Sequence, residues 1–549
     1  MLLGHVSDER YVALAGVMVE VDRGGETVAE TESTARGRIH VDLPPGRYRV
    51  TLRKDGFGAK AVELEVAPGD PPRQFRLLSD RLTGYVWPRW VRAGERAELC
   101  FHSPEAYRLS LHRYGLQKEF VRILGWYDEH GPNAVLQITP DGDYTQTGVR
   151  FNRVGYGTNP HHTQVVSAPE RSGLYFVHAR AESGAFFAAP WIVAPAQPSA
   201  PVAVLASTNT WNAYNNFGGR SNYVNSTGLP AEPIVYGRQE LDRYREGALG
   251  EWGRPDSAFL PLSFERPEPF NTVPEAAEAT DSIPGRQASH LAPVEWRLMA
   301  WLERQGFDYD VYADAQLHDG TLDLDAYRVL IISTHPEYWT RRQYERVRDW
   351  VRDRGGRLMY LGGNGVNCEV ELLDASTMRT KTHLAAVDGS LGQWDPDNAT
   401  KWLDSRFHRT VEPEASLLGV ATTEAGIMTA APFRVIRADH WIFGGTGLAN
   451  GDLFGTKSQH ERVPGGASGH ETDKITSYSP PGTVHLAKGL NPDEGGSDMV
   501  LHETPSGGAV FSVGSITWPS CLLVDDGVSR ITNNVLRRFV EAEGGVSKT

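Results

Sequence analysis

The sequence predicts a multidomain protein in which two N-terminal β-sandwich domains precede an α/β domain with a doubly wound sheet. Three observations support this fold class. The chain has 549 residues, which is more than one hydrophobic core can organise. Before residue 200, short stretches alternate apolar and polar residues, as half-buried strands do. After Pro201, apolar runs alternate with amphipathic helical stripes, which favours parallel strand pairing. We expect domains at residues 1–80, 81–198 and 199–549.

The first domain is expected to be a small β-sandwich. Valines stand at alternate positions 17, 19 and 21, and glutamates separate the apolar residues of 62–66. Glycine and proline pairs at 24–25 and 44–45 mark turns between these strands. Residues 45–50 (PGRYRV) resemble the late-strand signature of transthyretin-like and carboxypeptidase-regulatory sandwiches.

The second domain is expected to be an Ig-like sandwich. Short strand candidates recur without a long amphipathic helix between them. These candidates are residues 96–101, 134–139, 174–179 and 185–192. The proline-rich stretch at 193–201 (VAPAQPSAP) has the composition of a linker.

The third domain shows the rhythm of strand, helix and strand. Its predicted strands are residues 202–205, 309–312, 329–332, 357–361 and 509–513. Its predicted helices carry apolar stripes at Val294, Leu298, Trp301 and Leu302, at Tyr344, Val347 and Val351, and at Ile531, Val535, Phe539 and Val540. Residues 365–495 have weak periodicity, and we expect them to form insertions that cover the mouth of a site.

Composition limits the classes of partner. The net charge of −14 and the pI near 5.7 argue against nucleic acid and anionic membranes as partners. The start of the chain is charged too early for a signal peptide, and no apolar stretch approaches about 18 residues. The cysteines, at 100, 368 and 521, form no CxxC pair. We therefore expect a cytoplasmic protein that acts on a small molecule.

Polar residues cluster where predicted parallel strands end. His335 and Glu337 follow the strand at 329–332, the amide- and tyrosine-rich stretch 207–223 follows the first strand, and Asn364 follows the strand at 357–361. In open α/β sheets, ligands bind beyond the carboxyl ends of strands. Each feature has a plainer interpretation on its own, because tyrosines often pack at a rim and His-Pro-Glu can begin a helix. Their coincidence at one sheet edge favours a site.

Three motifs resemble the large subunit of N,N-dimethylformamidase over about residues 200–545. They are residues 207–223 (STNTWNAYNNFGGRSNY), 335–339 (HPEYW) and 361–364 (LGGN). The resemblance implies a glutamine-amidotransferase-like domain that hydrolyses a small N-substituted amide. It also implies a separate small partner subunit, and we expect a homo-oligomer.

The resemblance further implies one ferric iron ion held by Tyr214, Tyr223 and Glu337. His335, Asn364, Lys381 and Glu471 match polar residues of the active site. Phenolate and carboxylate are hard oxygen donors that suit a hard ion, and a strong Lewis acid keeps a tyrosine ionised at neutral pH. Three protein ligands leave positions for water and substrate.

The remaining site residues have expected roles in amide hydrolysis. Glu471, in the stretch 469–473 (GHETD), is the candidate general acid/base, and a solvated acidic turn is its alternative. His335 is expected to orient Glu337 or to stabilise an oxyanion, as Asn364 also could. Trp211 and Phe217 are expected to line the substrate pocket.

Several alternatives remain at this level. Amidotransferases place a nucleophilic cysteine on the turn where this chain has Asn364, and Cys368 lacks an evident His/acid pair. The pair at His161 and His162 indicates a polar loop, and His440 with Trp441 indicates packing or a lid. A non-catalytic or carbohydrate-binding assembly is the main competing function, although most of the 14 tryptophans lie beyond residue 200. An amide hydrolase that uses another metal is a third.

Overall fold

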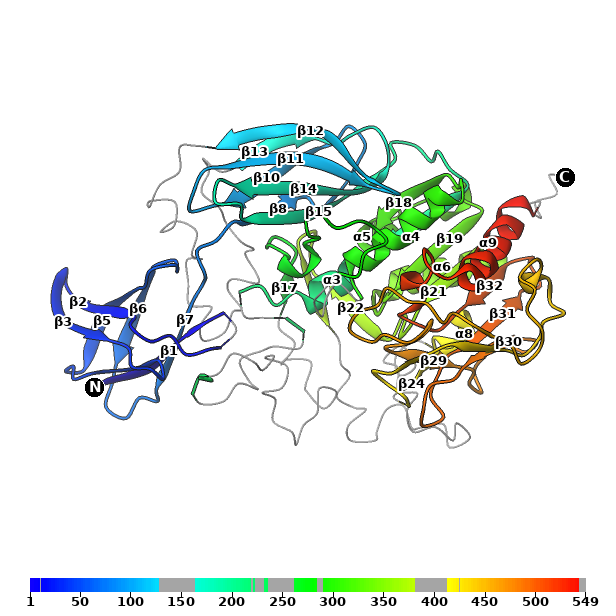
Figure 1. Cartoon of the computed structure of the whole chain (residues 1–549). Helices are drawn as coiled ribbons and strands as arrows, with labels where there is room; N and C mark the ends of the chain where they lie inside the picture. Colours follow the sequence, from blue (N-terminus) through cyan, green and yellow to red (C-terminus); the bar gives the residue numbers. More distant parts are fainter. Residues whose placement is uncertain are drawn as a thin grey trace.

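The computed structural model describes residues 1–9, 11–127, 163–218, 221–222, 232–235, 261–283, 290–380, 412–423 and 425–542. Figure 1 shows a small β module at one end, a second β-sandwich, and a mixed region of helices and strands that carries the C-terminus. The strand expected at 134–139, the histidines at 161 and 162, Tyr223 and Lys381 lie outside the described residues.

The first β module is a two-sheet sandwich, as the alternating pattern predicts. One sheet has the order β3-β2-β5-β6 and the other β4-β1-β7. Alternate residues such as Val19, Val21 and Val50 point into its core, while Glu63 and Glu65 face out. Its strands are β1 (Leu2–Asp8), β2 (Met18–Arg23), β3 (Glu26–Glu32), β4 (Arg38–Val41), β5 (Gly46–Arg53), β6 (Lys60–Val66) and β7 (Arg73–Leu77).

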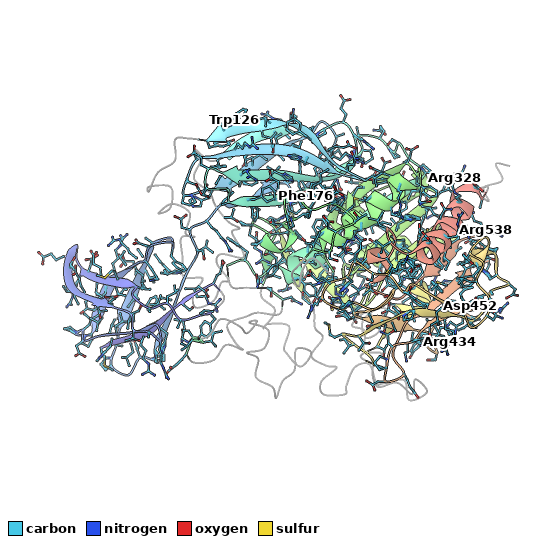
Figure 2. The ribbon with its side chains drawn as sticks, in the orientation of Figure 1. Trp126, Phe176, Arg328, Arg434, Asp452 and Arg538 are labelled. Carbon is cyan, nitrogen blue, oxygen red and sulfur yellow. The ribbon has the colours of Figure 1, made fainter. Side chains whose placement is uncertain are left out.

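The larger sheet of the second β-sandwich is covered on both of its faces. That five-stranded sheet has the order β12-β11-β14-β15-β9, and the smaller sheet is β13-β10-β8. Leu109, Leu111 and Val177 fill the space between the sheets. On the opposite face of the larger sheet, the ring of Phe176 (Figure 2) stacks on that of Tyr114, with 4.2 Å between the ring centroids. Both residues belong to the core cluster of the following region. The strands are β8 (Thr83–Trp87), β9 (Trp90–Arg92), β10 (Arg96–His102), β11 (Tyr107–Tyr114), β12 (Lys118–Tyr127), β13 (Thr163–Ser167), β14 (Gly173–Ala181) and β15 (Phe186–Ala194).

A nine-stranded sheet organises the rest of the chain, in the order β18-β16-β19-β21-β32-β31-β30-β26-β27. The first five strands pair in parallel, as the strand and helix rhythm predicts, and the other four pair antiparallel. The strands are β16 (Val202–Ala206), β18 (Tyr309–Ala313), β19 (Val329–Thr334), β21 (Arg357–Gly362), β26 (Phe433–Val435), β27 (Leu453–Phe454), β30 (Val484–Gly489), β31 (Asp498–Glu503) and β32 (Ala509–Ser512).

Helices cover both faces of the parallel strands. Val329 and Ile331 share one core cluster with helices α4 (Ala292–Arg304) and α9 (Asp526–Glu541). Leu330 and Ile332 share the other with helices α6 (Arg341–Arg354) and α8 (Ala415–Leu418). A strand that is buried on both faces reads as a continuous apolar run, which is why residues 329–332 are recognisable in the sequence.

Two expectations from the sequence need correction. The stretch 207–223 begins with helix α3 (Thr208–Tyr214) and is not a plain loop. Part of 365–495 extends the main sheet as β26, β27 and β30, so this region is more than a set of insertions over a site. The described parts of both segments contact distant residues, and local periodicity does not record such contacts.

Smaller elements complete the region. Four short strands form a separate sheet in the order β17-β23-β22-β20. Strand β24 pairs with β29, and β25 pairs with β28. Among the described residues, no helix is both long and apolar enough to cross a membrane. The elements are β17 (Leu262–Ser263), η5 (Pro269–Asn271), α5 (Asp314–Asp319), η7 (Leu324–Ala326), β20 (Tyr338–Trp339), β22 (Cys368–Leu372), β23 (Thr377–Thr380), β24 (Ala421–Thr423), β25 (Ala430–Ala431), η9 (Trp441–Phe443), β28 (Ser468–Gly469), β29 (Thr472–Lys474) and η10 (Trp518–Ser520).

Candidate active site

Four chain segments meet beyond the carboxyl ends of the parallel strands. Helix α3 follows β16 and ends at Tyr214, His335 and Glu337 follow β19, and Asn364 follows β21. Glu471 does not follow one of these parallel strands and lies in the short connection between β28 and β29. Parallel strands bring the first three segments to one edge of the sheet, which is the geometry expected from the sequence.

Tyr214, His335 and Glu337 form the centre of the site. The Tyr214 hydroxyl lies 3.0 Å from His335 Nε2 and 3.0 Å from Glu337 Oε2. His335 Nε2 lies 2.9 Å from Glu337 Oε2. His335 and Glu337 are each only 1% exposed, whereas Tyr214 is half-buried. The three polar groups therefore converge on one point that opens outward at the tyrosine.

Glu471 and Asn364 form the second part of the site. The Asn364 side-chain amide donates to Glu471 Oε2 at 2.8 Å, and the same oxygen lies 3.8 Å from His335 Nε2. The side chain of Glu471 is 18% exposed. Glu471 thus lies between the buried His335 and solvent, where a group that carries protons can reach both of them.

The charges around His335 favour its protonated form. Burial lowers the pKa of His335, but the carboxylates of Glu471 and Glu337 outweigh burial and raise it to about 9. The Nδ1 atom lies 3.0 Å from the carbonyl oxygen of Gly363. At neutral pH the imidazolium therefore donates from both nitrogens, toward the backbone on one side and the acidic groups on the other.

The backbone around the site is strained. Thr334, Asn364, Val366 and His470 have positive φ angles of 63°, 50°, 55° and 68°. Side chains with a branched Cβ rarely adopt this region. Strain of this kind persists where surrounding contacts over-determine it, and it gathers at functional sites.

Glycine at position 363 permits the close approach of two segments. A Cβ atom on Gly363 would lie 2.5 Å from the carbonyl oxygen of Glu471 and 2.8 Å from the amide nitrogen of Ile516. No side chain fits there, so the turn after β21 can touch the Glu471 segment only with glycine at this position.

A buried Tyr–Asp pair fixes the turn that carries Asn364. The Tyr360 hydroxyl donates to Asp473 Oδ2 at 2.6 Å and accepts from the amide of Gly365 at 2.7 Å. The amide of Asn364 donates to Asp473 Oδ1 at 2.9 Å. Because Asp473 belongs to β29 beside Glu471, the pair ties both active-site segments together.

Cys368 supports Glu337 and does not stand as a nucleophile. Its buried thiol donates to Glu337 Oε1 at 3.5 Å, while the amide of Glu337 donates to Thr210 Oγ1 at 3.2 Å. All three cysteines lie among the described residues, where each is buried and none forms a disulfide.

The two predicted pocket residues occupy packed positions. Trp211 is 3% exposed and donates from Nε1 to Glu295 at 2.9 Å. Phe217 is 2% exposed and packs in a cluster with Leu78 and Tyr85. Their apolar character reflects core packing, which explains the difference from the expected role as a pocket wall.

His440 and Trp441 pack on helix α9 and do not cover the site. The guanidinium of Arg538, which Figure 2 shows on α9, lies 4.5 Å from the centre of the Trp441 ring. The packing interpretation of this pair is therefore the one that the structure supports.

Three further histidines, His290, His460 and His470, adjoin the centre, and the sequence did not single them out. The His290 ring lies 4.6 Å from that of Tyr214 and 5.4 Å from that of His470. His460 Nε2 lies 3.2 Å from His470 Nδ1. They come from separate segments of the chain, and only the position of His470 beside Glu471 could have drawn attention to it.

Part of the donor set expected for a metal ion comes together in the site. Among the residues that the structure describes, no group of three His, Cys, Asp or Glu side chains has the arrangement of a metal site. A tyrosine and a carboxylate oxygen do come together, because Tyr214 Oη and Glu337 Oε2 are 3.0 Å apart. Two oxygens each about 2.1 Å from one ion, at right angles, lie about 3 Å apart. These two ligands fit one ion, and Tyr223 lies outside the described residues.

Comparisons with known proteins identify a family for two parts of the chain. Residues 120–532, more than half of the chain, match the family described as N,N-dimethylformamidase beta subunit-like, C-terminal. Residues 1–77 match the carboxypeptidase regulatory-like domain, as the motif at 45–50 suggested. The solved structure of a 5-hydroxyisourate hydrolase from Klebsiella pneumoniae shares 26% identity and covers 14% of this chain and 89% of that chain, but its TM-score of 0.12 carries no argument.

Two curated relatives are N,N-dimethylformamidase beta subunits. The protein from Paracoccus aminophilus is 26% identical over 402 residues, which is 64% of this chain and 50% of the relative. The protein from Alcaligenes sp is 25% identical over 431 residues, which is 68% of this chain and 53% of the relative. The chain spans about half the length of these relatives. The length of the family match shows that the chain belongs to the N,N-dimethylformamidase beta subunit-like family.

Proposed function

We propose that this chain is a metal-dependent hydrolase of a small N-substituted amide. The observation that carries the proposal is the convergence of Tyr214, Glu337 and His335 at the strand ends, with Glu471 beside them. Membership in a family named for dimethylformamidase supports this reaction class. Its α/β region is proposed to be related to glutamine amidotransferases, with Asn364 where those enzymes place a cysteine.

We propose that Tyr214, Glu337 and Tyr223 hold one ferric ion. The separation of 3.0 Å between Tyr214 Oη and Glu337 Oε2 suits two ligands of one ion, and hard oxygen donors suit ferric iron. When bound, such an ion acts as a Lewis acid toward an amide carbonyl and toward water. The same donors would also accept another hard metal, so the identity of the ion is itself part of the test.

Different residues of the chain have different roles in the proposed proton transfers. Glu471 accepts the proton of the water whose oxygen forms a bond to the carbonyl carbon, and it returns this proton to the nitrogen as the C–N bond breaks. The products are a carboxylic acid and an amine. His335 keeps its proton, orients Glu337 and offers positive charge to the developing oxyanion. Asn364 orients Glu471 through its bond of 2.8 Å, and Lys381 is a further proposed polar residue of the site.

A second subunit belongs to the proposal. Both curated relatives carry the name beta subunit, which supports a smaller partner chain for this one. We also propose that the chain forms a homo-oligomer. Size-exclusion chromatography with light scattering, on the chain alone and with a co-expressed partner, measures both.

Metal analysis with a visible spectrum tests the proposed site. Purified protein is expected to hold about one iron per chain and to absorb in the visible range from phenolate-to-iron charge transfer. Tyr214→Phe and Glu337→Gln are expected to lose the colour, the iron and hydrolysis of formamides and acetamides. Glu371→Gln is the matched control, since Glu371 lies on β22 and pairs with Arg379 at the surface.

Two outcomes would contradict the proposal. Wild-type protein that is metal-free yet hydrolyses amides after chelation would exclude the metal. Retention of iron and activity in Glu337→Gln would move the site elsewhere in the chain.

A further inference from the structure

Arg266 is a buried arginine that none of the proposed reaction steps uses. Its exposed fraction is 0%, and a buried guanidinium is costly unless its N–H donors find acceptors. Nε donates to the carbonyl oxygen of Ser263 at 3.0 Å, and Nη1 donates to that of Phe217 at 3.2 Å. Nη2 donates to both oxygens of Asn212, at 3.0 Å to the carbonyl and at 3.1 Å to the side chain.

These contacts lie at the end of helix α3, which carries Tyr214. Asn212 is in the last turn of the helix, where carbonyl groups lack partners within the helix and a positive group satisfies them well. Asn215, the residue after Tyr214, donates from its side-chain amide to the carbonyl oxygen of Pro267 at 2.8 Å. Tyr214 therefore lies between two residues that are both bonded to the segment 263–268.

Arg89, from the second β-sandwich, holds the same segment. It lies between β8 and β9 and is 4% exposed. Its guanidinium donates to the carbonyl oxygens of Phe264 and Arg266, and its Nη1 lies 3.0 Å from the carboxylate of Glu268. Figure 1 shows this edge of the sandwich, at β8 and β15, next to β17 and α3. Contacts therefore run from the sandwich through the segment 263–268 to helix α3.

The geometry of the site depends on where helix α3 ends. The Tyr214 hydroxyl lies 3.0 Å from His335 Nε2 and 3.0 Å from Glu337 Oε2. The helix has only seven residues, and an isolated helix of this length is not stable. Its position is therefore set by contacts with the rest of the molecule, and those of Arg266 are the ones nearest to Tyr214 in the last turn.

We propose that Arg89 and Arg266 are positioning residues for Tyr214, through which the second β-sandwich takes part in the active site. Arg266 holds the end of helix α3, and Arg89 holds the segment that carries Arg266. This inference rests on the proposed function, because it concerns the placement of one of the proposed ligands. It gives the sandwich a part in catalysis beyond that of a neighbouring domain.

Arg266→Lys and Arg89→Lys in the full-length protein test the proposal. Lysine keeps the charge but replaces the planar fork of donors with one ammonium group, so it cannot bond to the same set of carbonyl oxygens. Each variant is expected to lower kcat for a small amide by up to about a hundredfold, because a misplacement of about 1 Å can have that effect. KM is expected to stay nearly unchanged, and the phenolate-to-iron absorption band is expected to shift.

Arg113→Lys is the matched control. Arg113 also joins the sandwich to the α/β region and is 3% exposed. It donates to Glu303 at 2.6 Å and to the hydroxyl of Tyr309 at 3.2 Å. Tyr309 begins β18, so this contact lies at the amino ends of the parallel strands, away from the site. The control is expected to lower the unfolding temperature as Arg89→Lys does, and to leave kcat and the absorption band unchanged.

Hydrogen exchange in the metal-free protein depends on neither iron nor turnover. The amide of Asn215 donates to the carbonyl oxygen of Asn212 at 3.3 Å, at the end of helix α3. Arg266→Lys and Arg89→Lys are each expected to speed exchange of this amide by about tenfold or more, because hydrogen bonds from charged donors are stronger than those between neutral groups. Arg113→Lys is expected to leave it at the wild-type rate.

The outcomes separate this proposal from the proposed function. Equal decreases in kcat for Arg113→Lys and Arg89→Lys would overturn it, as would faster exchange with an unchanged kcat and band. Unchanged exchange at Asn215 in Arg89→Lys would overturn it even where Arg266→Lys does not fold. Wild-type protein without metal or amide hydrolysis would defeat the proposed function, and exchange at Asn215 would still decide whether the two arginines hold helix α3.

Discussion

At the residue scale, Glu337 uses its two carboxylate oxygens differently. Oε2 faces Tyr214 and His335 in the site, while Oε1 accepts from the thiol of Cys368. The carboxylate is 1% exposed, so its orientation depends on these partners. A buried carboxylate in a fixed orientation is prepared to bind an ion without further rearrangement.

Replacement of Cys368 separates a supporting role from a nucleophilic one. Cys368→Ala removes one weak hydrogen bond to Glu337, and a loss of about 0.5–1.5 kcal/mol predicts a decrease of at most about tenfold in kcat. Steady-state kinetics with a small amide measures it. Complete loss of turnover with normal iron content would instead make Cys368 the nucleophile.

Burial of Glu295 makes stability depend on pH. Its carboxyl accepts from Trp211 Nε1 at 2.9 Å, and burial raises its pKa from 4.5 to about 8. The folded state therefore binds a proton that the unfolded state releases above pH 4.5. The free energy of unfolding should fall by about 1.4 kcal/mol for each pH unit between the two pKa values.

Thermal unfolding between pH 5 and pH 8 checks this sign. Glu295→Gln cannot ionise and keeps an acceptor for Trp211, so its unfolding temperature should decline less over this range than that of the wild type. Asp314, whose burial raises its pKa to about 7, contributes the same sign in both proteins. Equal slopes for the two proteins would show that Glu295 is not the group responsible.

At the element scale, two buried Tyr–Asp pairs lie at opposite ends of the parallel strands. Tyr360 and Asp473 tie β21 to β29 beside the site. Tyr327 and Asp310 make a similar bond of 2.9 Å near the start of β18, away from the carboxyl ends of the strands. The pair of Tyr327 and Asp310 is therefore a control within the same chain, because it is buried and takes no part in the site.

Tyr360→Phe and Tyr327→Phe should differ in activity and not in stability. Each leaves a buried aspartate without one donor and should lower the free energy of unfolding by about 1–3 kcal/mol. Only Tyr360→Phe should lower kcat, by roughly tenfold per 1.4 kcal/mol of lost positioning, with iron content and KM nearly unchanged. Denaturant unfolding and steady-state kinetics measure the two effects. A similar decrease in kcat for both variants would reduce the Tyr360 pair to a structural role.

At the scale of the whole molecule, the first module has a hydrophobic core separate from that of the large sheet. The first module has its own core cluster, and the second sandwich shares Tyr114 and Phe176 with the cluster of the large sheet. A multidomain chain of this kind does not unfold in a single two-state transition. The first module should therefore give a calorimetric transition of its own.

Metal removal should shift only one of these transitions. Residues 1–80 contain no tryptophan, so the transition of the first module is visible by calorimetry and silent in tryptophan fluorescence. A chelator should lower the unfolding temperature seen by fluorescence, because a ligand at one hundred times its Kd stabilises the folded state by about 2.7 kcal/mol. Glu337→Gln should show no chelator effect. A chelator shift confined to the first module would place the ion there.

Some segments of the site could be predicted from the sequence, and others could not. The run at 329–332 is buried on both faces and reads directly as a strand, so the position of His335 and Glu337 followed from local pattern. Helix α3 did not, because its Thr- and Asn-rich sequence has low helix propensity. Two buried acidic side chains accept hydrogen bonds at its beginning, where Asp314 accepts from the amide of Asn209 at 2.8 Å and Glu295 from that of Ser207 at 3.3 Å.

By itself, the sequence determined the strand and helix rhythm, the family, and the placement of Tyr214, His335, Glu337 and Asn364 at one sheet edge. The rhythm and the placement follow from local periodicity and from the geometry of parallel strands. The family was indicated by the motifs at 207–223, 335–339 and 361–364. Only the tertiary structure decided the partners of Glu471, the histidines around Tyr214 and the buried contacts of Arg89 and Arg266. Those contacts join segments far apart in the chain through single side chains and strands of two or three residues, which are too short to leave a periodic signal.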